Sequence, residues 1–351
     1  METDVPQKKQ KALTSTCDIL FTLLRNGLYA DREPEMIPEL TVDEWEGLLE
    51  EAGRQTVTGT VYHGLSRLGS SYPLPSEVLF RFVAEANRIE VESRQKEQVA
   101  WNEFQRLKGE GFHPVVMKGP AVACFYPAPM LRESGDIDIY LRDEEFRKLC
   151  DSLEGTYRLS DGSVHYDRRG VDFDLHDKYF DLHLPAERLP EVPSPYATLL
   201  MLSAHILKHA SGPGVGLRQF CDMAVACEKL SFDPAVLLET YRKAGLWKWS
   251  ILLHAFLRKY LGLKDIFEGT LPTADPSPLL RIVLEGGNFG HHGPRREKVL
   301  GTDIRQRKID TALRYVRRLP FSLKYAPRET FRYLGELIRG NLRREATTEP
   351  Q

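Results

Sequence analysis

Hydrophobic residues recur with a helical period over most of this 351-residue chain, and a strand-like pattern replaces it only in the middle. Apolar positions three or four residues apart occur in 20–28 and again over 76–109. Thr41, with Glu44 three positions later, is typical of a capping box at the start of a further helix. The pattern therefore predicts a helical N-terminal region over residues 1–110.

The pattern shortens after this region, and residues 111–190 read as an α/β unit. Short runs suited to strands occur at 114–117, 136–141, 157–159, 164–167 and 171–175. Residues 143–153 have a helical pattern, and Arg168-Arg169-Gly170 is typical of a hairpin turn between the last two strands.

Helical patterns resume at about residue 194 and define a C-terminal helical region over 191–345. We expect helices at 195–209, 217–230, 234–244, 247–261, 278–285 and 308–318. The whole pattern predicts an α+β protein in which a mixed sheet is flanked by N- and C-terminal helical regions.

Composition excludes little. The net charge of −2 does not by itself indicate a nucleic-acid or membrane partner, so nucleic acid remains an open possibility. Residues 295–345 carry 15 Lys or Arg against 6 Asp or Glu, which fits either solvated helix faces or a basic wall facing an anionic substrate. Five scattered cysteines without a CxxC pair, and the lack of a long apolar stretch, predict a soluble cytoplasmic protein with no membrane partner.

Two acidic patterns carry the candidate chemistry. Asp136 and Asp138 lie two apart in an apolar run, so in a strand they would share a face and need solvent or a cation between them. Asp172, Asp174 and His176 share a face of a later strand in the same way. If the two strands are neighbours, three carboxylates converge, and such oxygen ligands favour Mg²⁺ over zinc.

These residues resemble a known family. Lys118-Gly119, Arg132, Asp136-Ile137-Asp138-Ile139 and Asp174-Leu175-His176 are similar to the motifs of the uncharacterised nucleotidyltransferase family, in the polymerase-beta-like superfamily. The similarity spans roughly 115–176, with looser likeness in the preceding helices and at His205, His209 and Asp222. It implies a nucleotidyltransferase fold for 111–190 and Mg²⁺-dependent transfer of a nucleoside monophosphate from an NTP, with release of pyrophosphate.

The resemblance also implies site residues. Asp136 and Asp138 match the metal-binding pair and Asp174 matches the third acid, with Asp172 as the alternative. The nucleotide-binding candidates are Lys118, Gly119, Arg132, Ser134 and Gly135. The glycine turn is Gly119-Pro120 rather than the family's Gly-Gly or Gly-Ser, and Ser134-Gly135 directly precedes the acids, so either turn is a candidate for the phosphate contact.

The expected partners are an NTP, with ATP the expected nucleotide, two Mg²⁺ ions that Mn²⁺ can replace, and an unidentified acceptor that the basic segment suggests is anionic. Two other readings stay open: a catalytically inactive nucleotide-binding regulatory or antitoxin-like module, and a helical scaffold. A zinc site at His176 and His183 is not expected, because their spacing fits neither a helix nor a strand pair. Core or capping roles are expected for His205 and His209, and solvation for His291-His292.

Overall fold

The chain forms two compact units. The computed structural model describes residues 5–70, 72–153, 156–158, 163–182, 184–212, 214–287, 304–332 and 334–335. The first unit comprises Met1–Tyr179, Gly216–Lys229 and Tyr260–Leu263, and the second comprises Phe180–Val215, Leu230–Lys259 and Lys264–Gln351. The division into regions 1–110, 111–190 and 191–345 stays a prediction.

The first unit begins with four helices: α1 (Val5–Leu28), α2 (Val42–Arg54), α3 (Thr58–Ser66) and α4 (Ser76–Gly109). The predicted capping box is confirmed: the Glu44 N–H donates to the Thr41 hydroxyl, and the Glu44 carboxylate accepts from the Thr41 N–H at 2.9 Å. Helix α3 was not expected. It packs closely on its neighbours because Gly59 and Gly64 have no side chain; a Cβ on Gly59 would lie 2.0 Å from the Leu131 carbonyl oxygen.

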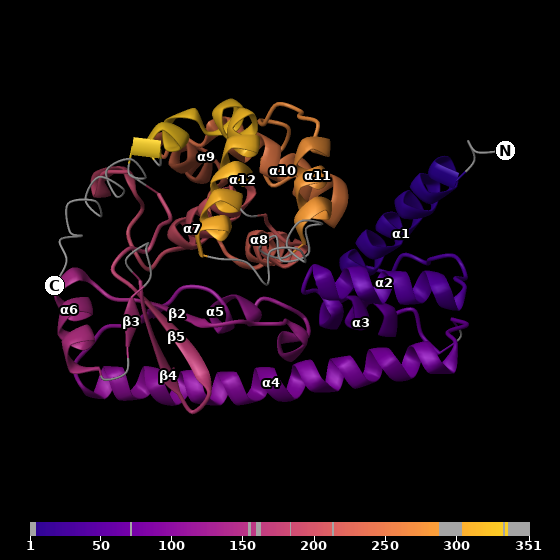
Figure 1. The fold of residues 1–351 in the computed structure, drawn as a ribbon, viewed down its shortest axis with the longest axis horizontal. Coiled ribbons are helices and arrows are strands. Elements are labelled where there is room, and N and C mark those ends of the chain that lie inside the picture. Colours follow the sequence, from indigo (N-terminus) through magenta and orange to yellow (C-terminus); the bar gives the residue numbers. More distant parts are fainter. Residues whose placement is uncertain are drawn as a thin grey trace. The chain divides into compact units, whose positions relative to one another are not determined.

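A five-stranded sheet follows, in the order β1-β2-β5-β4-β3. Figure 1 labels β2, β3, β4 and β5. The strands are β1 (Val115–Val116), β2 (Ile137–Tyr140), β3 (Tyr157–Arg158), β4 (Val164–Arg168) and β5 (Val171–His176). Strands β2 and β5 are parallel, and the other pairs are antiparallel. The sheet is therefore mixed, as predicted. The hairpin turn is also confirmed, since Arg169 and Gly170 have positive φ angles of 54° and 79° between β4 and β5.

One face of the sheet is apolar and covered by helices. Its core contains Ile137 and Ile139 of β2, Phe173 and Leu175 of β5, and side chains from α4 and from α6 (Asp143–Ser152). Short elements join β1 to β2, namely α5 (Pro120–Ala123) and the 3₁₀ turn η1 (Pro129–Leu131), and α8 (Leu217–Lys229) also belongs to this unit. Because strand residues alternate between faces, Asp138 and Asp174 lie on the opposite face of the sheet.

The second unit is helical. It contains η2 (Ala186–Arg188), α7 (Pro195–Ala210), α9 (Pro234–Lys243), most of α10 (Trp247–Leu261), α11 (Ser277–Gly286) and α12 (Ile304–Tyr325). The helices predicted from periodicity are confirmed, although α12 is longer than expected. Predictions for His183 and His291-His292, and part of the basic segment 295–345, lie outside the described residues.

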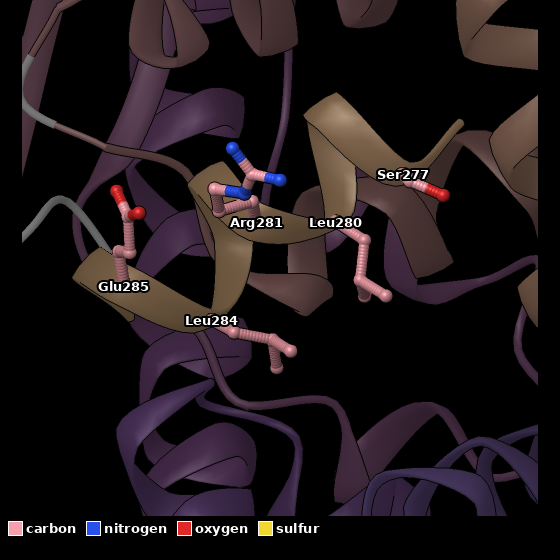
Figure 2. A pocket seen from close by; sticks show the side chains of 5 residues that line it. All are labelled: Ser277, Leu280, Arg281, Leu284 and Glu285. Atoms are coloured by element: carbon pink, nitrogen blue, oxygen red, sulfur yellow. The ribbon is translucent and has the colours of Figure 1, made fainter. Parts of the chain in front are cut away.

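Two further findings concern a hollow on α11 and the apolarity of the helices. An open hollow on α11 is lined by Ser277, Leu280, Arg281, Leu284 and Glu285, and none of these is a predicted site residue (Figure 2). Among the residues that the structure describes, no helix is both long and apolar enough to cross a membrane.

Candidate functional site

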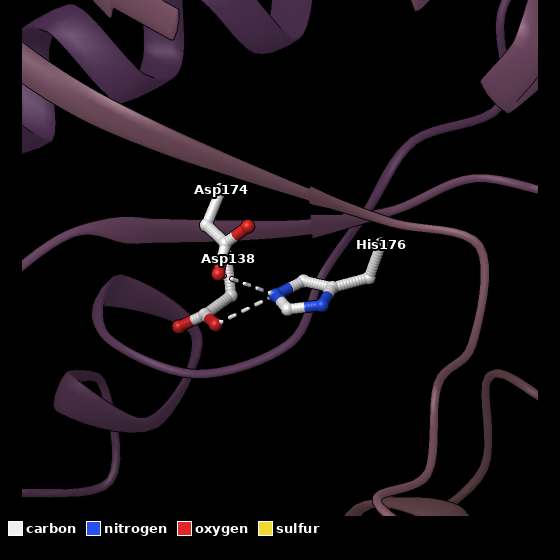
Figure 3. A group of neighbouring side chains, drawn as sticks. All are labelled: Asp138, Asp174 and His176. Carbon is white, nitrogen blue, oxygen red and sulfur yellow. Dashed lines mark hydrogen bonds and ion pairs between the residues drawn. The ribbon is translucent and has the colours of Figure 1, made fainter. Parts of the chain in front are cut away.

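Two predicted acids face each other across the parallel strands. Asp138 of β2 is paired in register with Asp174 of β5, and both are buried. The neighbouring Ile139 and Leu175 anchor the strands in the core, which fixes the acids side by side. One ligand atom from each of Asp138, Asp174 and His176 lies within 4.8 Å of the other two (Figure 3). The convergence expected from the sequence is therefore present for these two acids.

His176 lies between the two carboxylates. Its Nε2 is 3.0 Å from Asp138 Oδ1 and 3.1 Å from Asp174 Oδ2. Burial alone would lower the histidine pKa, but the hydrogen bonds and charges of the two acids outweigh burial and raise the pKa of His176 to about 9. The imidazolium supplies a positive charge where the acids converge. From the sequence, His176 is predicted on the same strand face as Asp174, but it is weighed as a metal ligand only together with His183. Its spacing of two residues from Asp174 could have indicated that it lies beside the acids.

Lys118 also contacts the acids. Its Nζ donates to Asp138 Oδ1 at 2.8 Å. Burial would raise the pKa of Asp138, but Lys118 and His176 together hold it well below its usual range, so this carboxyl is ionised at neutral pH. The Met117 N–H donates to the Asp138 carbonyl at 3.1 Å and so brings the Lys118-Gly119 turn beside β2. Gly119 has a φ of 57°, which favours glycine at the start of α5.

Asp136 precedes β2 and is exposed. It is not in the close group formed by Asp138, Asp174 and His176. Its pKa is raised because the surrounding chain removes part of its hydration and because the charges of Asp138 and Asp174 repel its own. A cation would relieve that repulsion.

The two candidates for the third acid differ in their surroundings. Asp174 lies beside Asp138, and its Oδ1 is 3.3 Å from His165 Nε2. The Asp172 side chain is 45% exposed and contacts the other nitrogen of His165, at 2.9 Å from Nδ1. Of the two, only Asp174 lies in the close group. Its role as third acid stays a prediction.

Arg132, a predicted nucleotide-binding residue, forms a buried ion pair within the fold. Its guanidinium is buried and donates from Nε and Nη2 to the two carboxylate oxygens of Asp222 on α8, at 2.8 and 2.7 Å. The Tyr126 hydroxyl donates to the same carboxylate at 2.7 Å. The side chain thus ties the loop before β2 to α8, and a role of Arg132 in nucleotide binding stays a prediction. The sequence offered one indication of this ion pair: Asp222 is a charged residue on the apolar face of its predicted helix.

The Ser134-Gly135 turn is held from both sides. Glu133 Oε1 accepts from the Thr58 N–H at the start of α3 at 2.7 Å, and Lys96 on α4 donates to the Ser134 carbonyl at 2.6 Å. Arg218 on α8 donates to the Glu133 carbonyl at 3.0 Å. Neither Lys96 nor Arg218 is among the predicted site residues.

The donor set suits a hard divalent cation. Asp138 and Asp174 present oxygen ligands from a buried pair of like charges, and Mg²⁺ and Mn²⁺ prefer such oxygens. Protonated His176 cannot be a ligand, so its lone pair becomes available only once the proton leaves. The residues present therefore fit a metal held by carboxylates.

The whole site lies within a segment that matches a protein-family model. A family model described as "Uncharacterised nucleotidyltransferase" matches residues 41–262, from α2 into the second unit. No match was found among curated proteins or among solved structures.

Proposed function

Because the chain belongs to the uncharacterised nucleotidyltransferase family, we propose that it transfers a nucleoside monophosphate from an NTP to an acceptor hydroxyl and releases pyrophosphate. The observation that carries the proposal is the register of β2 and β5, which sets Asp138 opposite Asp174 with Asp136 two residues earlier. The proposed nucleotide is ATP, and the proposed place of action is the cytoplasm, which agrees with five free thiols.

Asp136, Asp138 and Asp174 are the proposed holders of two Mg²⁺ ions, which Mn²⁺ can replace. When bound, these ions neutralise the triphosphate and orient its phosphates. The acceptor oxygen forms a bond to the α-phosphorus while the bond from that phosphorus to the β-bridging oxygen breaks. Pyrophosphate leaves with the bridging oxygen, and the acceptor proton passes to Asp174. Positioning and charge neutralisation supply most of the rate.

The basic residues of 295–345 support an anionic acceptor. Incubating the protein with each labelled NTP and a cell extract, and identifying by mass what becomes nucleotidylated, would name both substrates.

The proposed chemistry is tested by replacing aspartates with asparagines, which removes the negative charge and keeps the size of the side chain. Asp136→Asn combined with Asp138→Asn should abolish Mg²⁺-dependent pyrophosphate release. Unchanged turnover would contradict the assignment of these two acids as metal ligands of a nucleotidyltransferase. Asp151→Asn, at an exposed position on α6, is the matched control and should keep wild-type turnover. Asp174→Asn compared with Asp172→Asn then decides the third acid, since only the true one should stop the reaction.

One observation favours a second candidate, a nucleotide-binding regulatory or antitoxin-like module without turnover. Lys118 and His176 already place positive charge against Asp138 and Asp174, which reduces the need for a metal. Calorimetry with NTP and Mg²⁺ followed by a turnover assay separates the two: binding without pyrophosphate release supports the module.

A further inference from the structure

Resting on the proposed nucleotidyl transfer, we propose that Lys96 and Arg218 form the subsite that binds the β- and γ-phosphates of the nucleotide, next to Ser134-Gly135. Neither side chain is part of the acid group or of the motifs that indicated the family. The subsite would hold the part of the substrate that leaves as pyrophosphate.

The two cations converge on one turn from distant parts of the chain. Lys96 Nζ on α4 donates to the Ser134 carbonyl, and Arg218 Nη1 on α8 donates to the Glu133 carbonyl. Those carbonyls belong to consecutive residues, whose Cα atoms are about 3.8 Å apart. Ser134 in turn is two residues before Asp136, a span of at most about 7 Å that a triphosphate can bridge.

Among the described residues, neither cation has a hydrogen bond or ion pair to a carboxylate. Within the described parts of the chain, Lys96 and Arg218 donate only to these backbone carbonyls. Arg88, on the same helix as Lys96, instead pairs with Glu85 and Glu92. Partly buried charge without a counterion is costly, so the pair favours binding of an anion.

The electrostatics agree with this reading. Burial lowers the pKa of Lys96; the charge of Glu92 opposes this effect, and the charge of Arg218 adds to it. Burial also lowers the pKa of Arg218, with Arg132 contributing repulsion. An oxyanion bound between the two side chains would reverse both effects.

Two carboxylates whose charges act on Arg218 accept hydrogen bonds from other groups. Asp222 accepts from Arg132 and Tyr126, and the Glu133 carboxylate accepts from the N–H of Thr58. Neither carboxylate hydrogen-bonds to Lys96 or Arg218, although the negative charges of both raise the pKa of Arg218.

Two acids act on Lys96 through their charge: Glu92, which is paired with Arg88, and Asp136, one of the proposed metal acids. Gly135 directly precedes Asp136 and is exposed; a Cβ built on it would meet no described, non-neighbouring atom within 4 Å. The backbone at Gly135 is therefore open to a ligand.

The role follows from the chemistry of the leaving group. Negative charge grows on the β-phosphate as its bridging oxygen separates from the α-phosphorus. Fixed cations at that position stabilise the transition state more than the bound substrate. A planar guanidinium and a compact ammonium are both well suited to phosphate oxygens.

The test measures nucleotide binding without turnover. Lys96→Gln and Arg218→Gln are titrated by calorimetry with Mg²⁺ and an ATP analogue whose α,β-bridging oxygen is a methylene, and separately with AMP. We expect each variant to bind the analogue about tenfold or more weakly, with a weaker dependence on salt, and to bind AMP as wild type does. Arg94→Gln, at an exposed position on the same helix, is the control and should change neither affinity. Lys96→Arg should restore most of the affinity.

A second measurement does not depend on the variants folding. Pyrophosphate with Mg²⁺ should protect Lys96 of the wild-type protein from acetylation by acetic anhydride, whereas exposed Lys148 should stay reactive. Absence of protection would contradict the assignment.

The remaining outcomes distinguish failure of the phosphate subsite from failure of the proposed nucleotidyl transfer. Folded Lys96→Gln and Arg218→Gln variants that bind the analogue normally would overturn the subsite and leave nucleotidyl transfer intact. Variants that change only the KM for the acceptor would assign the cations to an anionic acceptor instead, which also overturns the nucleotide subsite. A wild-type protein that binds no nucleotide would overturn both.

Discussion

Replacing Asp222 with asparagine should strongly destabilise the first unit. The carboxylate is 4% exposed and accepts three short hydrogen bonds, two from Arg132 and one from the Tyr126 hydroxyl. Asparagine keeps the size but removes the charge, and its amide turns a donor toward the guanidinium. Arg132, 5% exposed, would then be a buried cation without its counterion.

The magnitude follows from that geometry. Breaking a buried ion pair from one side costs about 3–5 kcal/mol. A value of about 4 kcal/mol lowers the equilibrium constant for folding nearly a thousandfold. Replacing both partners together, Arg132→Met with Asp222→Leu, should recover most of the loss, because no buried charge is then left unpaired.

The assay is urea-dependent hydrogen exchange followed by mass spectrometry, read on peptides from α5, η1 and α8. Local exchange is needed because the chain has two compact units and a single transition does not report on one of them. Glu90→Gln breaks an exposed pair with Arg94 and is the control, with an expected loss below about 0.5 kcal/mol. An Asp222→Asn protein within about 1 kcal/mol of wild type would refute the reasoning.

Three further substitutions test the site and its support. All three are read by urea-dependent hydrogen exchange on peptides of the first unit. In metal-free protein, the pKa of His176 is raised from 6.5 to about 9, so protonation of His176 stabilises the folded state. This stabilisation, up to about 3 kcal/mol, is complete below about pH 6.5 and is lost as the pH rises through about 9. His176→Gln should remove that part of the stability difference between low and high pH, and equal differences in both proteins would contradict it. Phe173→Ala, at a fully buried position stacked on Tyr166, should cost about 3–5 kcal/mol; a loss below about 1 kcal/mol would show that the sheet core repacks. Gly119→Ala should cost about 1–3 kcal/mol because of its positive φ, whereas Gly109→Ala, in the last turn of α4, should be neutral or stabilising; equal stabilities for the two variants would count against strain at Gly119.

The sequence by itself determined the elements and the two acidic strands. Helical and alternating periodicities depend only on neighbours along the chain, so they predicted α4, α10 and the β4–β5 hairpin closely. The spacing of two also placed Asp172, Asp174 and His176 on one face of β5. Helix α3 was missed because its nine residues contain two glycines and three β-branched residues, which weaken the local helical signal.

The tertiary structure decided which side chains meet. Asp138 and Asp174 are 36 positions apart, and only the parallel register of β2 and β5 sets them opposite each other. The partner of Arg132 lies 90 positions away on another helix, and a guanidinium beside a metal motif looks the same in sequence whether it contacts phosphate or a buried carboxylate. Lys96 and Arg218 carry no sequence motif at all. Long-range pairing depends on packing and desolvation, which local periodicity does not encode, so the acids were predictable from the sequence and their charged surroundings were not.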